Sequence, residues 1–309
     1  MKQSILTPRA AALERIKALV LDTLSSPESK RAYGQALDDF FRWCEAAAVT
    51  EFSKATVNAY RTALEQRHLS SSTINQRLSA IRKLAVEAAD NQFIPLDQAM
   101  AISRVKGTRQ AGVRTGHWLT REQAERLISE PDATTLRGVR DRALLAVLIG
   151  CGLRCRETAS LCVGHIQRRD GRWVIVDLIG KGRRVRSVPM PLWTRQTIEV
   201  WLTMAGIDSR FLFRRLDSGG RAAGDHLTAK RIFQIVGSAG ARIGIPRLAP
   251  HDLRRTFARL AHQGRSSLEQ IQLSLGHASV MTTERYLGVR QDLNDAPCDH
   301  LGIAIEVSR

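Results

Sequence analysis

Two arginines and a histidine in the second half of the chain stand in patterns that suit the binding of a phosphate group. Arg154 lies in the segment GCGLRCRETASL, where it follows a turn broken by glycine and precedes a helix. Glu157, three positions later, is placed to hold the guanidinium group of Arg154. In the segment APHDLRRTFA, His251 and Arg254 stand at positions i and i+3, on one face of a predicted helix. Together these side chains offer two planar cations and an imidazole to a negatively charged group.

A third segment, LSLGHASVMTTERYLG, adds His277 and Tyr286. The two residues are nine positions apart, so a single straight helix would point them in roughly opposite directions. Gly276 is typical of a helix end, and Thr282 and Thr283 are suited to begin a new helix. A helix end, a short turn and a second helix would bring His277 and Tyr286 to one site.

Each of these patterns also has an ordinary structural explanation. An H-x-x-R pair is usually a solvated helix face, and a tyrosine near the end of a chain often packs with its hydroxyl bonded locally. A lysine at the tip of a hairpin, such as Lys181, is often only a turn residue. The joint occurrence of the patterns, in order and in one strongly basic chain, favours a function.

The second half of the chain is expected to be mostly helical with a small β-sheet. Thr120 and Gln123 form a capping-box pattern that opens a helix, and a strongly apolar helix follows through RDRALLAVLIGCG. The segment RWVIVDLIGKGRRVRSVPM is rich in Val and Ile and predicts a β-hairpin with residues 180–182 at its tip. From Pro191 onward the pattern predicts helices again.

Residues 1–105 are expected to form a separate bundle of short helices. Apolar residues recur there at helical spacing, and Ser53 is expected to cap one of the helices. Residues 106–116, KGTRQAGVRTG, have no apolar period and contain three glycines, which predicts a linker. The second domain would then comprise residues 117–309.

The chain is strongly basic, with a formal net charge of +17 over 309 residues. Only 8 of its 47 basic residues are lysine and 39 are arginine, whose planar fork meets phosphate oxygens with two hydrogen bonds. The charge is spread along the whole chain, which favours a folded protein that binds a polyanion over a disordered basic arm. A generally basic protein without such a partner is the alternative that charge alone leaves open. Binding of RNA is less favoured, because the sequence lacks the expected aromatic platforms.

Several classes of protein are not supported by the sequence. Cys151, Cys155 and Cys162 could share a helical face, but their spacing matches no common zinc pattern and an odd total of five cysteines suggests no disulfide framework. No Walker A motif, H-E-x-x-H motif or paired carboxylates with magnesium spacing occur, so neither a metal nor another cofactor is expected. No apolar run approaches the roughly 20 residues of a membrane span, and the N-terminus has no uninterrupted apolar region. We therefore expect a cytoplasmic protein without membrane contact.

The motifs GLRCRE, HDLRRTFA and LGHASVMTTERY, with the hairpin lysine, resemble those of the tyrosine recombinase (phage integrase and Xer) family over essentially the whole chain. The resemblance implies a mainly α protein with a small β-sheet: a SAM-like core-binding domain at 1–105 and an α+β catalytic domain at 117–309. The implied catalytic set is Arg154, Lys181, His251, Arg254, His277 and the nucleophile Tyr286, with Glu157 in support. All six catalytic positions hold the expected residue type. Three nearby positions depart from the family pattern and bear on local packing and DNA preference: Arg156, His165 and Arg255.

The resemblance also implies DNA strand exchange without ATP or metal. A phosphodiester transition state gathers negative charge on its non-bridging oxygens, which two arginines and a histidine can meet. Tyr286, whose ordinary pKa is about 10, must lose its proton as it attacks, and His251 is the expected base or proton relay. Lys181 is the expected acid for the departing 5′ oxygen. The intermediate would be a 3′-phosphotyrosine, and strand exchange would pass through a Holliday junction.

The implied partners are double-stranded DNA at a specific site and further copies of the same chain, as a tetramer in the synapse and a monomer or dimer off DNA. When bound to DNA the protein would be associated with the nucleoid. Base contacts are expected from one helix face and one later lysine: Thr73, Asn75, Arg77, Arg82, Lys83 and Lys230.

The end of the chain and two other functions leave alternatives open. The tail DHLGIAIEV alternates apolar residues and suits a short strand that docks on a neighbouring protomer, or else on its own domain. A type IB topoisomerase would use the same kind of tyrosine site but relax supercoiled DNA without a defined sequence. A non-catalytic DNA-binding protein could retain the fold without the reaction.

Overall fold

The computed structural model describes residues 6–109, 118–180 and 185–277, together with Thr283 and Leu287. The chain divides into two compact units, Met1–Arg114 and Thr115–Arg309. It is mainly helical with small antiparallel sheets, which confirms the predicted fold class. Within the described residues, no helix has both the length and the apolar character that a membrane span requires.

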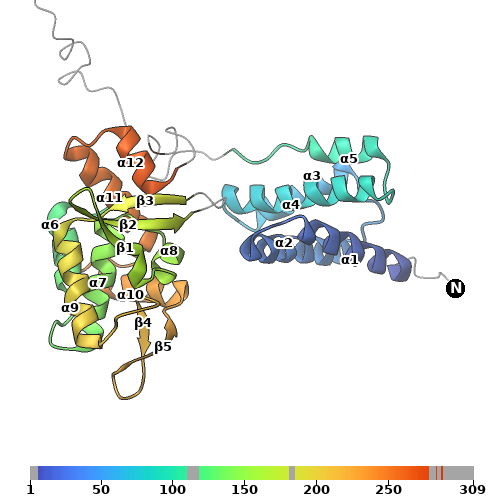
Figure 1. Cartoon of the computed structure of the whole chain (residues 1–309). Coiled ribbons are helices and arrows are strands. Elements are labelled where there is room, and N and C mark those ends of the chain that lie inside the picture. Colours follow the sequence, from blue (N-terminus) through green and yellow to red (C-terminus); the bar gives the residue numbers. More distant parts are fainter. Residues whose placement is uncertain (1–5, 110–117, 181–184, 278–282, 284–286, 288–309) are drawn as a thin grey trace, which may run out of the picture. The chain divides into compact units, whose positions relative to one another are not determined.

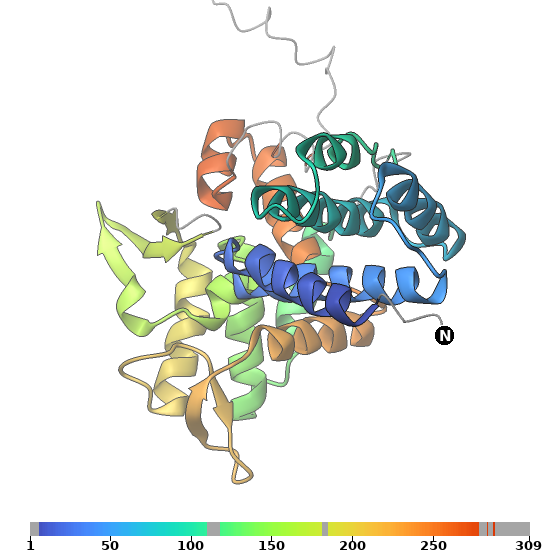
Figure 2. The same ribbon diagram turned by 90° about the vertical axis from the view of Figure 1, so that its right-hand side faces the viewer.

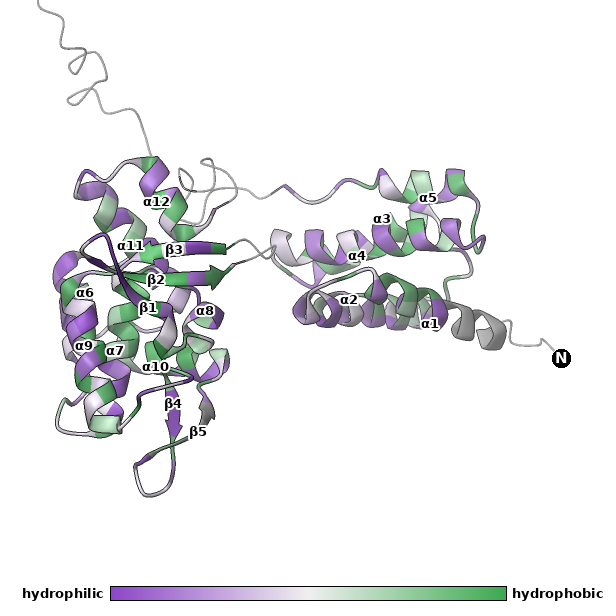
Figure 3. Ribbon diagram, viewed as in Figure 1, coloured by the Kyte–Doolittle hydropathy of each residue, from purple (hydrophilic) through white to green (hydrophobic). Residues whose placement is uncertain are grey.

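The N-terminal unit is a bundle of helices, as the sequence predicts. Its elements are α1 (Leu6–Asp22), α2 (Pro27–Ala46), α3 (Lys54–Gln66), α4 (Ser71–Asp90) and α5 (Leu96–Ser103). The helices carry both hydrophilic and hydrophobic residues along their length (Figure 3), and the predicted apolar stripe of α4, including Ile74, Leu78 and Ile81, is buried. Ser53 caps α3 by accepting a hydrogen bond from the backbone N–H of Thr56, as predicted.

The first residues of the predicted linker lie against α4. The side-chain amide of Asn75 exchanges two hydrogen bonds of 2.9 Å with the backbone N–H and carbonyl of Thr108. A Cβ atom at Gly107 would lie 2.3 Å from Oδ1 of Asn75, so only glycine permits this approach. Residues 106–109 thus belong to the surface of the N-terminal unit, and residues 110–116 lie outside the described residues.

The C-terminal unit consists of helices and two small antiparallel sheets (Figure 1). Its elements are α6 (Arg121–Ser129), α7 (Leu136–Gly150), α8 (Cys155–Ala159), η1 (Val163–His165), β1 (Ile166–Arg169), β2 (Arg172–Ile179), β3 (Val185–Pro189), α9 (Leu192–Ala205), β4 (Arg214–Leu216), β5 (Ala222–His226), α10 (Ala229–Arg242), α11 (Pro250–Gln263) and α12 (Leu268–Leu275). The capping box of Thr120 and Gln123 is formed at the start of α6, as predicted.

The apolar helix α7 is the centre of the core of this unit. Every residue from Ala143 to Gly150 is buried, which explains why the sequence of this helix is apolar on all sides. α7 packs against α6, α8, α9 and α11. The segment that carries Arg154 follows directly after the C-terminal end of α7, so this buried helix sets where that segment begins.

The predicted hairpin is formed by β2 and β3, and β1 adds a third antiparallel strand in the order β1-β2-β3. The register is irregular between Ile175 and Leu178, where Asp177 has a φ of 56° and makes a β-bulge. Beyond the bulge, Leu178 pairs with Arg186. The hairpin tip, residues 181–184, lies outside the described residues.

The prediction that only helices follow Pro191 was wrong for one segment. β4 and β5 form a second hairpin, which extends away from the rest of the C-terminal unit in both views (Figures 1 and 2). Its turn is closed by Asp217, whose backbone N–H donates to the carbonyl of Arg221 and whose Oδ1 accepts from the N–H of Arg221. The paired strands are too short to show an apolar alternation in the sequence, so only the turn residues gave a signal.

Candidate active site

Arg154 stands at the start of α8, directly after a turn that only glycine accommodates. Gly152 has a φ of +60°, and a Cβ atom there would lie 2.7 Å from Cδ1 of Phe257 on α11. The turn takes the chain from the end of buried α7 to the first turn of α8, where Arg154 is the N-cap residue. Glycine at position 152 therefore fixes where the guanidinium group of Arg154 begins.

Glu157 holds Arg154 in place, as the sequence predicts. Its Oε1 accepts a hydrogen bond of 2.8 Å from Nη1 of Arg154, and its Oε2 accepts one of 2.9 Å from the backbone N–H of Arg154. Burial raises the pKa of the Glu157 carboxyl, but hydrogen bonds from Arg186 and the Arg154 backbone, with the charges of both arginines, outweigh it and bring the pKa to about 2. Glu157 is therefore a buried carboxylate at neutral pH.

A third arginine, Arg186 on β3, completes this group and was not expected from the sequence. Its Nη1 and Nη2 donate to Oε1 and Oε2 of Glu157 at 2.9 and 2.8 Å, and its Nε donates to the carbonyl of Ser274 at 2.9 Å. Arg186 thus ties the hairpin to α8 and to the end of α12, which packs beside β3 (Figure 1). One signal was available, since Arg186 shares a strand face with the buried Val188 and a cation on an inward face needs a partner.

Arg254 reaches the same turn from α11. It is 1% exposed, its Nη1 donates to the carbonyl of Gly152 at 2.6 Å, and its Nη2 donates to the carbonyl of Leu275. These bonds fix the plane of the guanidinium group between the Gly152 turn and the end of α12. His251, one helical turn earlier on α11, lies at the surface.

His277 follows directly on the end of α12, where the sequence predicts a helix to stop. Gly276 has a φ of +61° and ends the helix, and a Cβ atom on it would lie 2.9 Å from Cδ of Arg186. Nδ1 of His277 lies 2.9 Å from Oγ1 of the buried Thr283. This bond fixes the orientation of the imidazole ring.

Burial and the surrounding arginines both lower the pKa of His277. Burial and the charges of Arg254, Arg154, His251 and Arg186, in that order, lower the pKa of His277 to about 4. The imidazole is therefore neutral at pH 7, and its neighbourhood is already strongly cationic.

His251 lies in the same electrostatic environment. Although His251 is exposed, the protein atoms around it remove part of its hydration, and this loss, together with the charges of Arg255 and Arg254, lowers its pKa. Asp252 acts in the opposite direction, and Arg154 adds a smaller lowering. Arg154 and Arg254 therefore both lie within electrostatic reach of His251 and His277, and His251 acts on His277 as well. Four of the six predicted catalytic residues are thus brought together; Lys181 and Tyr286 lie outside the described residues.

The cysteines near the site are thiols of the core. Burial raises the pKa of Cys151 to about 12 and the pKa of Cys155 to about 11, so both are protonated at neutral pH. In the part of the chain that the structure describes, no group of three or more His, Cys, Asp or Glu side chains is placed to hold a metal ion.

The residues of α4 that the sequence predicts to contact DNA also make contacts within the N-terminal unit. Arg77 forms an ion pair with Asp39, which also accepts a hydrogen bond of 2.9 Å from Nη1 of Arg67. Arg82 donates from Nη2 to the carbonyl of Val105 at 2.5 Å. Each of these arginines therefore has a structural contact within the unit.

The other three predicted residues of α4, namely Thr73, Asn75 and Lys83, are each partly exposed. Asn75 holds Thr108, as described above, and the backbone N–H of Thr73 is capped by the hydroxyl of Ser70. Lys83 lies 3.6 Å, Nζ to Oε1, from Glu87 one turn later. Thr73 and Lys83 are partly exposed.

Lys230 lines a basic groove of about 340 Å³ on the C-terminal unit. The groove lies between the first turns of α7 and α10 and the strand β4, and its cationic side chains are Arg137, Arg140, Arg215, Lys230 and Arg231. Arg140 is buried and bonded to Asp141. The groove therefore presents positive charge at the N-terminal ends of two helices, a combination that suits anions.

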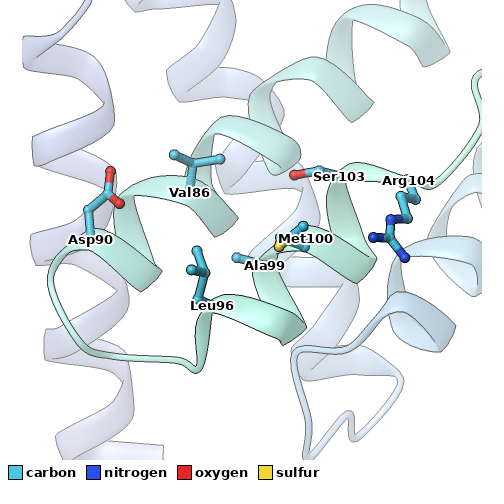
Figure 4. A pocket seen from close by; sticks show the side chains of 7 residues that line it. All are labelled: Val86, Asp90, Leu96, Ala99, Met100, Ser103 and Arg104. Atoms are coloured by element: carbon cyan, nitrogen blue, oxygen red, sulfur yellow. The ribbon is translucent and has the colours of Figure 1, made fainter.

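A second groove, of about 310 Å³, lies in the N-terminal unit between α4 and α5. Val86, Leu96, Ala99 and Met100 line it, and Asp90 and Arg104 stand at its opposite ends (Figure 4). It contains none of the predicted catalytic residues.

Two family models match the chain. The model of the phage integrase family matches residues 117–292, and the model of the phage integrase N-terminal SAM-like domain matches residues 16–92. Tyrosine recombinase XerC of Pseudomonas syringae pv. syringae (strain B728a) is 28% identical over 269 residues, which cover 84% of this chain and 85% of that protein. Tyrosine recombinase XerC of Erythrobacter litoralis (strain HTCC2594) is 32% identical over 227 residues, 72% of this chain and 70% of that protein.

Solved structures share the fold at low sequence identity. A lambda integrase dimer bound to a COC′ core site aligns with a TM-score of 0.70 and 13% identity, covering 92% of this chain and 97% of that one. The XerH site-specific recombinase bound to difH substrate, in a pre-cleavage complex, aligns with a TM-score of 0.65 and 20% identity, covering 86% of this chain and 76% of that one.

Proposed function

Because the chain belongs to the phage integrase family of tyrosine recombinases, it is an enzyme that cleaves and rejoins DNA, and we propose that Tyr286 is its nucleophile. Five further residues would complete the active site: Arg154, Lys181, His251, Arg254 and His277. The observation that carries the assignment is that Arg154, held by Glu157, and Arg254, held by the Gly152 turn, both act electrostatically on His251 and His277. Two oriented guanidinium groups in one neighbourhood suit a phosphate, whose oxygens each can meet in pairs.

The reaction we propose begins with attack of the Tyr286 hydroxyl oxygen on the scissile phosphorus. The bond from the tyrosine oxygen to phosphorus forms as the bond from phosphorus to the 5′ oxygen breaks, which leaves a 3′-phosphotyrosine. His251 takes the phenolic proton, and Lys181 gives a proton to the departing 5′ oxygen. A 5′ hydroxyl of another strand then reverses these steps, and the exchange passes through a Holliday junction without ATP or metal.

The electrostatics of the described residues support these roles. The transition state carries its added negative charge on the non-bridging oxygens, and preorganised arginines stabilise that charge without rearranging. His251 is neutral at pH 7 because its pKa is lowered, so it is able to accept a proton. His277 is also neutral and is oriented by Thr283, which suits a hydrogen bond to a phosphate oxygen.

We assign DNA binding to both units. Residues 1–105 would form the core-binding domain, 106–116 the linker and 117–309 the catalytic domain. The groove around Lys230 is suited to the phosphate backbone by its charge and by the two helix ends. Base contacts would come from the polar face of α4, where Thr73 and Lys83 are partly exposed.

The active assembly we propose is a homotetramer on two DNA sites, in which the tail after Asp299 docks on a neighbouring protomer. The alternating apolar residues of the tail support this assignment. Deletion of residues 300–309 should leave DNA binding intact and impair concerted exchange. An unchanged recombination rate would refute docking between protomers.

The test of the reaction is covalent capture on genomic DNA. Tagged protein is incubated with fragmented DNA of its source genome, the mixture is denatured in detergent, and DNA that stays attached to the protein is sequenced. Wild type should retain fragments that share one short sequence, and the Tyr286→Phe variant should retain none.

The other outcomes identify the other functions. Adducts spread over unrelated sequences, with relaxation of any supercoiled plasmid, would identify a type IB topoisomerase activity. Equal recovery from wild type and Tyr286→Phe would contradict nucleophilic attack by Tyr286 and favour a DNA-binding protein without catalysis.

A further inference from the structure

Arg186 occupies a position that connects three parts of the candidate site. Its side chain is 10% exposed, and its three guanidinium nitrogens donate to Glu157 and to the carbonyl of Ser274. Glu157 in turn binds Arg154 through Oε1, at 2.8 Å. The three side chains form a chain of ion pairs in the order Arg186, Glu157, Arg154.

The net charge of this group depends on Arg186. One carboxylate lies between two guanidinium groups, so the three side chains carry a net charge of +1. If Arg186 were absent, the carboxylate of Glu157 would face Arg154 alone and cancel its charge at a distance of 2.8 Å. If the carboxylate of Glu157 fully neutralised Arg154, then Arg154 would attract a phosphate only weakly.

We propose that Arg186 is a positioning residue of the recombination site, which neutralises Glu157 so that the charge of Arg154 stays available to the scissile phosphate. The proposal rests on the function proposed above, in which Arg154 binds that phosphate. Two residues then have two different roles. Glu157 fixes the direction of the Arg154 side chain, and Arg186 offsets the negative charge that the Glu157 carboxylate places beside Arg154.

The geometry favours arginine over lysine at position 186. The planar fork of arginine meets both carboxylate oxygens of Glu157, while its Nε remains directed at Ser274. Gly276 leaves room for this side chain, since a Cβ atom there would lie within 3.2 Å of Nε and Nη1 of Arg186. The residue therefore also supports the backbone that leads to His277.

The same contacts link the hairpin to the phosphate site. Arg186 lies on β3, five residues after Lys181, and pairs with Leu178 of β2 one pair away from the turn end of the described hairpin. Its bonds to Glu157 and Ser274 anchor this end of the hairpin to α8 and α12. A loss of Arg186 should thus affect cleavage without removing any group that touches DNA.

The test uses charge compensation within the full-length protein. The rate of covalent adduct formation is measured on a nicked suicide substrate that carries the sequence found by covalent capture, together with the Kd for the uncleaved site. Arg186→Met brings the net charge of the group from +1 to 0, and we expect cleavage to slow by on the order of 100-fold with DNA affinity changed only a few-fold. Adding Glu157→Gln to Arg186→Met returns the charge to +1 and should recover at least about tenfold of the rate.

The recovery distinguishes the proposal from a purely structural role. If Arg186 only holds the fold together, the double variant loses a second partner and should be as slow as Arg186→Met or slower, which would overturn the proposal. Arg186→Lys, which keeps the charge and loses the fork, should fall between wild type and Arg186→Met. If Arg186→Met does not fold, the comparison of Arg186→Gln with and without Glu157→Gln makes the same test.

The failure of the proposed function would look different. In that case wild type itself would form no adduct that depends on Tyr286. A wild-type adduct, together with no recovery in the double variant, would reject the role of Arg186 alone.

Discussion

Nη1 of Arg254 lies 2.6 Å from the carbonyl oxygen of Gly152, two residues before Arg154 in the chain. The bond joins α11, which carries Arg254, to the turn that precedes Arg154, and so connects the segments of the two arginines that we assign to the phosphate. The turn exists because Gly152 adopts a positive φ beside Phe257. The local conformation of a glycine thus determines the geometry of a site assembled from segments far apart in the sequence.

Replacement of Gly152 by alanine should destabilise the protein and slow cleavage together. The added Cβ would lie 2.7 Å from the ring of Phe257, in addition to the cost of the left-handed backbone. We expect Gly152→Ala to lower the free energy of unfolding by roughly 1–3 kcal/mol more than a glycine replacement that meets no neighbour. Urea unfolding at equilibrium measures this difference.

Gly206 provides the matched control. Its φ of +61° is nearly the same, and a Cβ atom there meets nothing within 4 Å. Gly206→Ala should lose only the backbone term, about 1–2 kcal/mol, and keep normal cleavage. Equal effects of the two substitutions on stability and cleavage would show that contact with Phe257 is unimportant.

The depressed pKa of His277 predicts how stability depends on pH. The unfolded imidazole titrates near 6.5 and the folded one near 4, so between these values the unfolded state binds more protons. The contribution of His277 is complete above about pH 6.5 and is lost as the pH falls toward 4. In urea unfolding at pH 7 and pH 5, the loss of stability on acidification should be smaller for His277→Asn than for wild type.

The carboxylate of Glu157 does not confuse this measurement. Its folded pKa of about 2 lies below its ordinary value, so its contribution is lost only at lower pH, below about 4.5. An identical change between pH 7 and pH 5 in wild type and His277→Asn would contradict the cationic surroundings that we describe for His277.

The sequence predicts much of the fold because local patterns decide it. The apolar period of α4, the cap at Ser53, the capping box at Thr120 and the Val-rich hairpin are all short-range signals, and each is confirmed. β4 and β5 were missed because their strands are short and carry no alternation. Their pairing depends on the tertiary context of the unit.

The sequence proposes the residue types of the candidate site but does not specify most of the contacts between them. The contact of Arg154 with Glu157 follows from spacing on one short helix and is confirmed. The contact of Arg186 with Glu157 spans 29 residues and depends on how the hairpin docks on α8 and α12, which no local pattern specifies. The contact of Arg254 with Gly152 spans 102 residues and is a product of core packing in the same way.

Replacement of Asn75 by aspartate should lower the stability of the N-terminal unit and leave the DNA sequence preference unchanged. In Asn75→Asp the amide nitrogen that donates to the carbonyl of Thr108 becomes an acceptor, while Gly107 leaves no room for adjustment. We expect a loss of about 1–3 kcal/mol and faster exchange of the Thr108 amide hydrogen in the full-length protein. Asn58→Asp, which makes the same change on α3, is the control. An unchanged exchange rate at Thr108 with altered sequence preference would instead support a role of Asn75 in base contact.

The groove around Lys230 should contribute to the salt dependence of DNA binding. If Lys230 and Arg231 each neutralise a phosphate, the double variant Lys230→Gln with Arg231→Gln should reduce the slope of log K against log salt by about 1.8. Arg126→Gln is the control, because Arg126 donates to the carbonyl of Ile243, at the opposite end of α10. A slope that stays at the wild-type value in the double variant would show that Lys230 and Arg231 do not contact the DNA phosphates.

The role of Arg254 is tested most directly by removing the charge of the phosphate instead of the charge of the enzyme. Cleavage by wild type and Arg254→Ala is compared on two suicide substrates, one with the normal scissile phosphate and one with a neutral methylphosphonate at that position. Each protein preparation is used on both substrates, so any loss of folded protein lowers both cleavage rates by the same factor and cancels in their ratio. We predict that Arg254→Ala is about 100- to 1,000-fold slower than wild type on the phosphate and within a few-fold of wild type on the methylphosphonate. An equal loss on both substrates would contradict the claim that Arg254 acts on the charge of the phosphate.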